Sequence, residues 1–140
     1  MIKVGETGVD KRVADTRLLL TLEFPPTPDA KGKTSDFFEK ELRNRLLAPS
    51  IVLAEFVEYA GARIGEEAAK TRLRLLKERG MQTVPIEEVN ALIAGSLMLS
   101  HGNVPIADAL IASFVKVGVA DYVVTDDPHF RALGVKTKWL

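Results

Sequence analysis

Four acidic residues occupy positions from which their carboxylates could meet at one site. They are Asp15, Glu55, Asp108 and Asp127. Asp15 and Asp127 follow short apolar segments that are typical of buried strands, and Asp108 lies in the first turn of a helix that begins near Pro105. Ligands of open α/β sheets bind beyond the carboxyl ends of the strands. We therefore expect these acids at the binding edge of a sheet.

Glu55 is the only charged residue in the apolar segment from Ile51 to Val57. A lone carboxylate in such a stretch is costly unless it is paired or binds a cation. A buried salt bridge with Arg17 or Arg43 is the structural alternative. Glu55 is thus the acid that packing alone explains least well.

Carboxylates gathered at one place repel one another, and a divalent cation compensates them. Ligation by oxygen with retained water is what Mg²⁺ and Mn²⁺ prefer. One or two such ions can generate hydroxide and stabilise the leaving oxygen when a phosphodiester is hydrolysed. The pattern therefore favours metal-dependent hydrolysis of a phosphate ester.

Three of the acids also have an ordinary structural interpretation. Asp15 could cap the helix that begins at Thr16, Asp108 could complement a helix dipole, and Asp127 could form a turn before Pro128. Independent accidents would not place all four acids on one expected binding edge. Their joint occurrence favours a shared site.

The composition is that of one folded domain. The 140 residues are 46% hydrophobic, and nineteen basic residues balance nineteen acidic ones, which argues against wrapping of duplex DNA by bulk charge. The absence of cysteine excludes disulfides, a thiolate nucleophile and a zinc–sulfur site. No secretory signal and no apolar run of ~20 residues is present, so we expect a cytoplasmic protein without a membrane span. Few amide and many charged side chains suggest a thermophile.

Short apolar segments alternate with longer amphipathic ones along the chain. The expected strands are residues 12–14, 48–49, 81–84, 122–125 and 135–138. The expected helices are residues 18–22, a helix capped by Thr34 or Ser35 after a loop through Gly32, a helix at 51–63 capped by Ser50, and residues 66–79, 86–100 and 105–117. This order predicts a three-layer α/β/α fold over residues 12–140 with a central parallel sheet of four or five strands. Residues 1–11 are expected to be an extension or an edge strand.

Four segments in this order resemble the motifs of the PIN-domain nucleases, especially the small VapC-like toxins of prokaryotic toxin–antitoxin pairs. They are Ala14-Asp15-Thr16-Arg17-Leu18-Leu19, Ser50-Ile51-Val52-Leu53-Ala54-Glu55, Asp108-Ala109-Leu110-Ile111-Ala112 and Val123-Val124-Thr125-Asp126-Asp127-Pro128-His129-Phe130. The resemblance covers residues 12–140. It implies a PIN-like fold and metal-dependent cleavage of RNA.

The resemblance also implies roles for individual residues. The acids that would bind Mg²⁺ or Mn²⁺ and activate water are Asp15, Glu55, Asp108 and Asp127. Thr125 matches the hydroxyl residue that accompanies the last acid, Asp126 is the reserve candidate for that acid, and Thr16 is a supporting residue. Arg17 departs from the family pattern, which has a small or polar residue there. A cation at this position could pair with an acid of the site, contact phosphate or point elsewhere.

The resemblance further implies an RNA substrate, a cognate antitoxin and a homodimer. Arg17, Arg43 and Arg45 are candidates for RNA contacts, whereas His101 and His129 lack a histidine partner at metal-binding spacing and are expected in a turn and a loop. Apolar residues that could form a dimer face or an antitoxin groove, or belong to the core, are Phe37, Phe38, Val52, Phe56 and Tyr59.

Two other functions stay open from the sequence. Arg17 is compatible with a non-catalytic PIN-like module that binds RNA or a protein. A metal-dependent phosphatase on a similar sheet is disfavoured, because no Asp-x-Asp motif follows the first strand and no glycine-rich phosphate loop is present. The nuclease remains the leading hypothesis.

Overall fold

A five-stranded sheet forms the centre of the computed structural model, which describes residues 10–43 and 45–139. The strands are β1 (Arg12–Ala14), β2 (Leu46–Pro49), β3 (Gln82–Val84), β4 (Tyr122–Val124) and β5 (Thr137–Lys138). Their order is β3-β2-β1-β4-β5, and each neighbouring pair is parallel. Most of the segment that we expect to be an extension or an edge strand, residues 1–9, lies outside the described residues.

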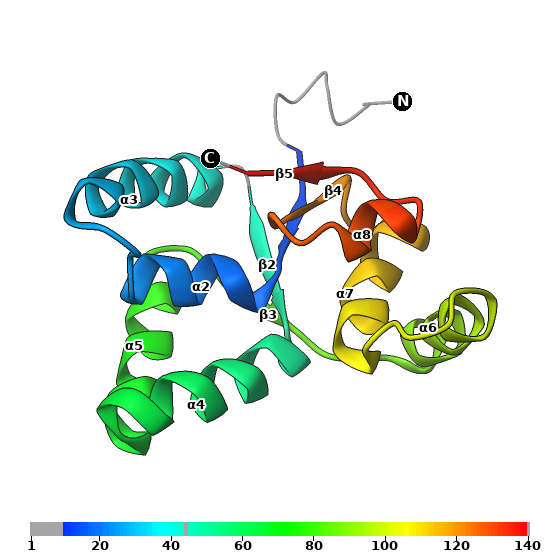
Figure 1. Ribbon diagram of the computed structural model, residues 1–140, viewed down its shortest axis with the longest axis horizontal. Coiled ribbons are helices and arrows are strands. Elements are labelled where there is room, and N and C mark those ends of the chain that lie inside the picture. The colour runs from blue at the N-terminus through cyan, green and yellow to red at the C-terminus, as the bar shows by residue number, and fades with distance from the viewer. Residues whose placement is uncertain (1–9, 44, 140) are drawn as a thin grey trace.

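Helices cover both faces of the sheet and complete three layers (Figure 1). One side carries α2 (Thr16–Glu23), α3 (Pro28–Leu42), α4 (Ser50–Ile64) and α5 (Glu66–Glu78), and the other carries α6 (Glu88–Ser100), α7 (Ile106–Lys116) and α8 (His129–Ala132). The predicted α/β/α fold with a parallel sheet is confirmed. Within the described part of the chain, no helix has the length and apolar character needed to cross a membrane.

The direction of winding reverses between β1 and β4. The chain proceeds from β1 outward to β2 and β3, and then returns to the other side of β1 with β4 and β5. Such a reversal opens a crevice at the carboxyl ends of the two adjacent strands. Ala14 pairs with Val124 in this register, so Asp15 and Thr125 follow side by side at the crevice.

Helix α3 begins earlier than the sequence predicts. The predicted loop through Gly32 and the predicted cap at Thr34 or Ser35 are wrong, because the helix starts at Pro28 and includes all three residues. The Thr27 hydroxyl caps the helix by accepting a backbone N–H of its first turn at 3.1 Å. Proline suits the first turn because that position has no N–H partner inside the helix.

Other boundaries differ by a few residues. Strand β2 begins at Leu46 instead of residue 48, since Leu46 pairs with β1 and is buried. Ser50 is the first residue of α4 and does not cap it, because Pro49 holds the N-cap position. The one-turn helix α8 replaces a predicted loop. These changes leave the order of the main elements intact.

A buried ion-pair network fastens α3 to the sheet near the amino ends of β1 and β4. The fully buried Glu41 carboxylate lies 2.8 Å from Arg12 Nη1 and 3.1 Å from Lys138 Nζ. It also accepts a hydrogen bond from the Tyr122 hydroxyl at 3.0 Å. Burial and the adjacent Glu41 charge raise the pKa of that hydroxyl. The network joins three strands and one helix through a single carboxylate.

The aromatic and apolar candidates for a partner surface belong mainly to the core. Phe38, Val52 and Phe56 have no exposed surface. Phe37 is half-buried and packs at a tilt against Trp139, with ring centroids 6.2 Å apart. Tyr59 alone among the five is half exposed. Core packing therefore accounts for most of these positions.

Candidate functional site

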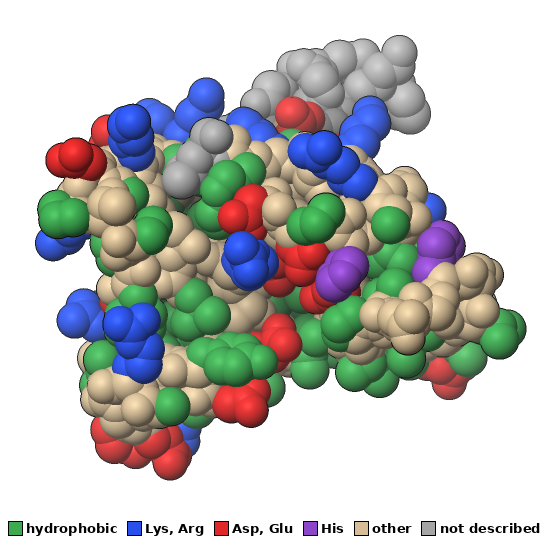
Figure 2. Space-filling view, in the orientation of Figure 1, with side chains coloured by type: hydrophobic (Ala, Val, Ile, Leu, Met, Phe, Trp, Pro, Cys, Tyr) green, Lys and Arg blue, Asp and Glu red, His purple; other side chains and the backbone are tan. Residues whose placement is uncertain are grey.

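All four predicted acids line one open cleft of about 410 Å³ at the carboxyl edge of the sheet. Asp15 follows β1, Glu55 lies on α4, Asp108 on α7 and Asp127 in the loop after β4. Figure 2 shows acidic side chains gathered in the hollow centre of this face, with a histidine beside them. The topology of the sheet brings together residues that are far apart in the sequence.

Thr125 links two of the acids through one hydroxyl. This hydroxyl donates to Asp15 Oδ2 at 2.7 Å and accepts the backbone N–H of Asp127 at 3.0 Å. The Thr125 backbone is itself fixed, because its N–H donates to the Lys138 carbonyl of β5 at 3.0 Å. The end of β1 and the loop after β4 are thereby linked through the Thr125 side chain.

Asp15 is a buried carboxyl with an altered affinity for protons. It occupies the N-cap position of α2 but makes no capping hydrogen bond through its side chain, and it is only 3% exposed. Burial, together with the negative charges of Asp108 and Asp127, raises the pKa of Asp15 to about 7 against the opposing effect of its Thr125 hydrogen bond. A cation placed among these acids would favour the ionised form.

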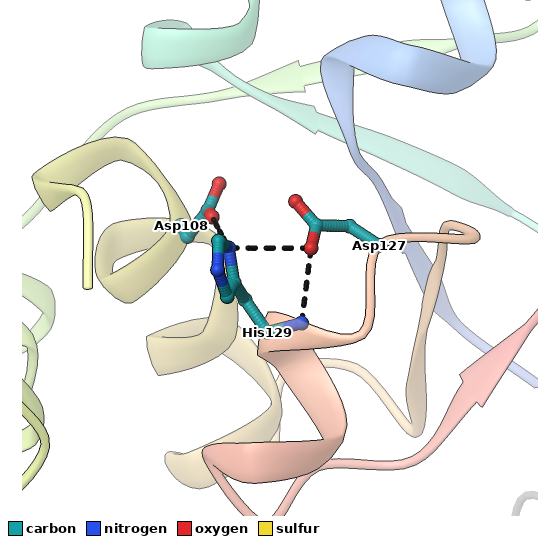
Figure 3. A group of neighbouring side chains, drawn as sticks. All are labelled: Asp108, Asp127 and His129. Atoms are coloured by element: carbon teal, nitrogen blue, oxygen red, sulfur yellow. Dashed lines mark hydrogen bonds and ion pairs between the residues drawn. The ribbon is translucent and has the colours of Figure 1, made fainter. Parts of the chain in front are cut away.

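Asp108, Asp127 and His129 form a compact group on one side of the cleft (Figure 3). His129 Nδ1 lies 3.3 Å from Asp127 Oδ1 and 3.4 Å from Asp108 Oδ2. One ligand atom from each residue lies within 4.8 Å of the other two, which is close enough for one ion to contact all three. Burial and the charge of Asp127 raise the pKa of Asp108.

Helix α7, which carries Asp108, is held in place by buried polar contacts as well as by apolar packing. Asn90 on α6 donates from Nδ2 to Ser113 Oγ on α7 at 3.0 Å. The same Asn90 accepts the backbone N–H of Glu87 at 2.9 Å and so caps its own helix. Both halves of the α6–α7 pair are thus fixed, and Asp108 is presented to the cleft from a rigid helix.

Glu55 is fixed by a hydroxyl rather than by a cation. Thr16 Oγ1 donates to Glu55 Oε1 at 2.6 Å, and Thr16 directly follows Asp15. No ion pair joins Glu55 to Arg17 or Arg43 in the described ranges, so the alternative of a buried salt bridge is wrong. Glu55 is half-buried and keeps its carboxylate directed to the cleft.

Arg17 forms its ion pair with Asp126 and not with one of the four acids of the cleft. Its Nε lies 2.5 Å from Asp126 Oδ1, and this contact raises the pKa of Arg17. Arg17 still lines the rim of the cleft, whereas Asp126 does not. Of the two neighbouring candidates for the last acid, the structure therefore brings Asp127 to the cleft.

Two of the other candidate residues lie away from the cleft, and one residue that was not a candidate, His129, lines it. Arg43 and Arg45 flank the amino end of β2, and the acids follow the carboxyl ends of parallel strands, so the two arginines lie at the opposite edge of the sheet. His129 lies beside Asp108 and Asp127, although no second histidine at metal-binding spacing marks it in the sequence. Its place two residues after Asp127, within the same tight turn, is the signal that could have identified it.

The donor set fits a hard divalent cation. Four carboxylates face one cleft, and two of them have raised pKa values because burial and neighbouring negative charges disfavour ionisation. Arg17, at the rim of the cleft, is engaged with Asp126. Carboxylate oxygens with room for water are the ligands that Mg²⁺ and Mn²⁺ bind.

A second groove of about 320 Å³ continues from the cleft between α2 and α4. Its lining residues are Arg17, Leu20, Thr21, Phe24, Tyr59 and Arg63, of which Arg17, Leu20 and Tyr59 also line the cleft. The Arg63 guanidinium lies over the Phe24 ring at 4.0 Å from its centroid. Two guanidinium groups and two aromatic rings therefore line this groove, and Arg17 and Tyr59 connect it with the acidic cleft.

Similar solved structures include toxin–antitoxin proteins. VapBC2 from Rickettsia felis, bound to a promoter DNA fragment, has a TM-score of 0.67 and 19% identity over 91% of this chain and 97% of the other. VapC20 of Mycobacterium tuberculosis, described as a sarcin-ricin loop cleaving toxin, has a TM-score of 0.75 and 14% identity over 90% and 97%. FitAcB from Neisseria gonorrhoeae has a TM-score of 0.68 and 20% identity over 90% and 95%. At these identities the likeness establishes the fold.

Comparisons of the sequence identify a family but no individual relative. Comparison with curated proteins gives no match. The PIN domain family matches residues 13–136, a range that contains the four acids and, apart from Arg12, the first four strands of the sheet. With the three-layer fold and the acidic cleft already described, this match shows that the chain belongs to the PIN domain family.

Proposed function

We propose that this protein is a Mg²⁺- or Mn²⁺-dependent endoribonuclease that hydrolyses phosphodiester bonds of RNA and acts as the toxin of a type II toxin–antitoxin pair. The observation that carries the proposal is the convergence of all four predicted acids on one cleft. Membership of the PIN domain family and the fold shared with VapC20, described as a sarcin-ricin loop cleaving toxin, support the choice of substrate.

The acids of the cleft would have two different roles in hydrolysis, metal binding and activation of water. A bound divalent ion would supply a water of lowered pKa and stabilise the leaving oxygen. Asp108 and Asp127 are near enough to each other to hold that ion together. Asp15 and Glu55, each fixed by a threonine hydroxyl, can orient a water and accept its proton.

Removal of divalent metal is expected to stop cleavage completely. Single-stranded RNA incubated with the protein should be cut in Mg²⁺ or Mn²⁺, remain intact in excess EDTA, and be cut again when metal is restored. The length of end-labelled fragments on a denaturing gel is the measurement. Cleavage that persists in EDTA, or a failure to cut a panel of RNAs with either metal, would reject the proposal.

The groove between α2 and α4 is proposed as the path of the RNA beside the scissile bond. Arg17 and Arg63 can contact phosphates, and the half-exposed ring of Tyr59 can stack on a base. The half-exposed Tyr59 lines both the groove and the cleft, so a base stacked on it would lie next to the acids.

Tyr59→Ala is expected to raise the KM for RNA roughly tenfold while kcat changes little, because one stacking contact is worth about 1–3 kcal/mol. Arg63→Ala should shift KM in the same direction and reduce its dependence on salt. Steady-state cleavage of a fluorescent RNA measures both. The matched control is Arg43→Ala, at the opposite edge of the sheet. An equal rise of KM in the control would show that no specific path exists.

An antitoxin partner and a homodimer belong to the same proposal. The fold is shared with chains of toxin–antitoxin complexes, which supports an antitoxin. Exposed apolar side chains on α6 and at the start of α7 support self-association, and they are Val89, Leu92, Leu99 and Ile106. The molar mass of the isolated protein, measured by light scattering, tests the dimer, and a monomer at every concentration would exclude it.

The non-catalytic alternative is motivated by Arg17, which stands where the family has a small or polar residue. Arg17 pairs with Asp126, which does not line the cleft, and this supports the catalytic proposal over the alternative. Tight binding of RNA without turnover in either metal would restore this alternative.

A further inference from the structure

The imidazole of His129 projects into the group of acids that is best placed to hold a metal. Figure 3 shows the ring lying between the carboxylates of Asp108 and Asp127. Its Nδ1 is 3.3 Å from the Asp127 carboxylate and 3.4 Å from that of Asp108. Ligand atoms from the three residues lie within 4.8 Å of one another. The nitrogen is thus part of the same coordination space as the two oxygens.

The backbone around His129 is fixed, so the ring is presented to the cleft without large rearrangement. The His129 N–H donates to Asp127 Oδ1 at 2.9 Å, and the Asp127 N–H donates to Thr125 Oγ1 at 3.0 Å. The next residue, Phe130, is fully buried and anchors α8 in the core. These contacts determine the position of the His129 Cα, although its side chain is 54% exposed and can adjust.

We propose that His129 is a direct ligand of the metal, which gives the site an Asp–Asp–His donor set with Asp108 and Asp127 and a preference for Mn²⁺ over Mg²⁺. The inference rests on the proposed metal-dependent function and adds a nitrogen ligand to it. Mg²⁺ selects oxygen donors and retains water, whereas imidazole nitrogen suits first-row transition metals. A histidine in the coordination sphere therefore shifts selectivity toward manganese.

The test uses the purified full-length protein with Mn²⁺ or Mg²⁺ alone as the probe. Pulsed electron paramagnetic resonance of bound Mn²⁺ should show coupling to a directly coordinated histidine nitrogen, and the coupling should disappear in His129→Ala. Isothermal titration calorimetry should show Mn²⁺ affinity reduced roughly tenfold or more in this variant, with a smaller change for Mg²⁺. His129→Gln, which keeps a polar side chain, should also lose the nitrogen coupling while its melting curve stays close to that of the wild type.

His101→Ala is the matched control, because His101 follows the last turn of α6 and its ring contacts the Leu97 carbonyl. The control should keep both the nitrogen coupling and the wild-type Mn²⁺ affinity. The inference would be overturned if bound Mn²⁺ showed no nitrogen coupling and His129→Ala bound Mn²⁺ with the wild-type affinity. The proposed function would still stand in that case if Asp108→Asn abolished Mn²⁺ binding. A wild-type protein that binds neither ion would instead overturn the proposed function.

Discussion

Asp15→Asn is expected to lower the rate of RNA cleavage by at least roughly 1,000-fold while the protein remains folded. The substitution keeps the shape of the side chain, and its amide oxygen can still accept the Thr125 hydroxyl that binds Asp15 Oδ2 at 2.7 Å. What it removes is the negative charge of the most buried of the four acids. Single-turnover cleavage in saturating Mn²⁺ measures the loss.

The same substitution is expected to stabilise the metal-free protein at alkaline pH. An aspartate carboxyl in water has an ordinary pKa of 3.8, whereas burial and like charges raise the pKa of folded Asp15 to about 7. Between these values the folded protein binds more protons than the unfolded chain, so the free energy of unfolding falls as pH rises through this window. The loss amounts to at most about 4 kcal/mol by pH 8, and neutral asparagine avoids it.

Thermal melts in EDTA measure the effect of Asp15→Asn on stability separately from its effect on cleavage. The melting temperature of Asp15→Asn should exceed that of the wild type at pH 8 and match it at pH 4. Asp36→Asn, which changes an exposed aspartate on α3, should leave both the melting curves and the cleavage rate unchanged. Retained cleavage in Asp15→Asn would exclude its catalytic role, and equal stability at pH 8 would contradict the cost of burying this charge among the other acids.

Glu41→Gln is expected to destabilise the protein by about 3–5 kcal/mol, the cost of leaving a buried cation without its partner. Arg12 is only 3% exposed and has its Nη1 on Glu41, and Lys138 and the Tyr122 hydroxyl converge on the same carboxylate. For a domain of this size the melting temperature should fall by roughly 10–15 °C. Urea unfolding at pH 7 measures the change in free energy.

Glu39→Gln on the same helix is the control for this substitution. Glu39 also forms an ion pair, with Arg79, but both partners are substantially exposed, so its loss should cost less than about 1 kcal/mol. Equal destabilisation by the two variants would show that burial does not govern the network. The residues that Glu41 contacts do not line the acidic cleft, so the substitution should act first on stability.

The acids could be located from the sequence because each has a local signal. Short apolar runs mark the ends of β1 and β4, and the rule that ligands bind at carboxyl ends of strands does not depend on side-chain detail. Glu55 stood out because its neighbours are apolar. The start of α3 could not be located in the same way, since proline and glycine signal a loop as readily as a helix start, and only the Thr27 cap distinguishes the two.

Contacts between residues far apart in the chain could not be predicted from the sequence. The sequence around Arg12 does not indicate that its partner is Glu41, 29 positions away, because this pairing depends on where α3 packs. Arg17 offered three possible roles, and the choice of Asp126 follows from the loop after β4. His129 is a different case, because Asp127 lies only two residues before it and only Asp108 is distant in the sequence.

The reversal of winding beside β1 has a consequence for synthesis. Strand β1 pairs with β2 on one side and with β4 on the other. The side that pairs with β4 has no partner strand until residues 122–124 have been translated. Chains emerge from the ribosome amino end first. A prematurely terminated product that lacks this strand also lacks Asp127 and His129, so its acidic cleft is incomplete on the side of β1 that β4 would cover.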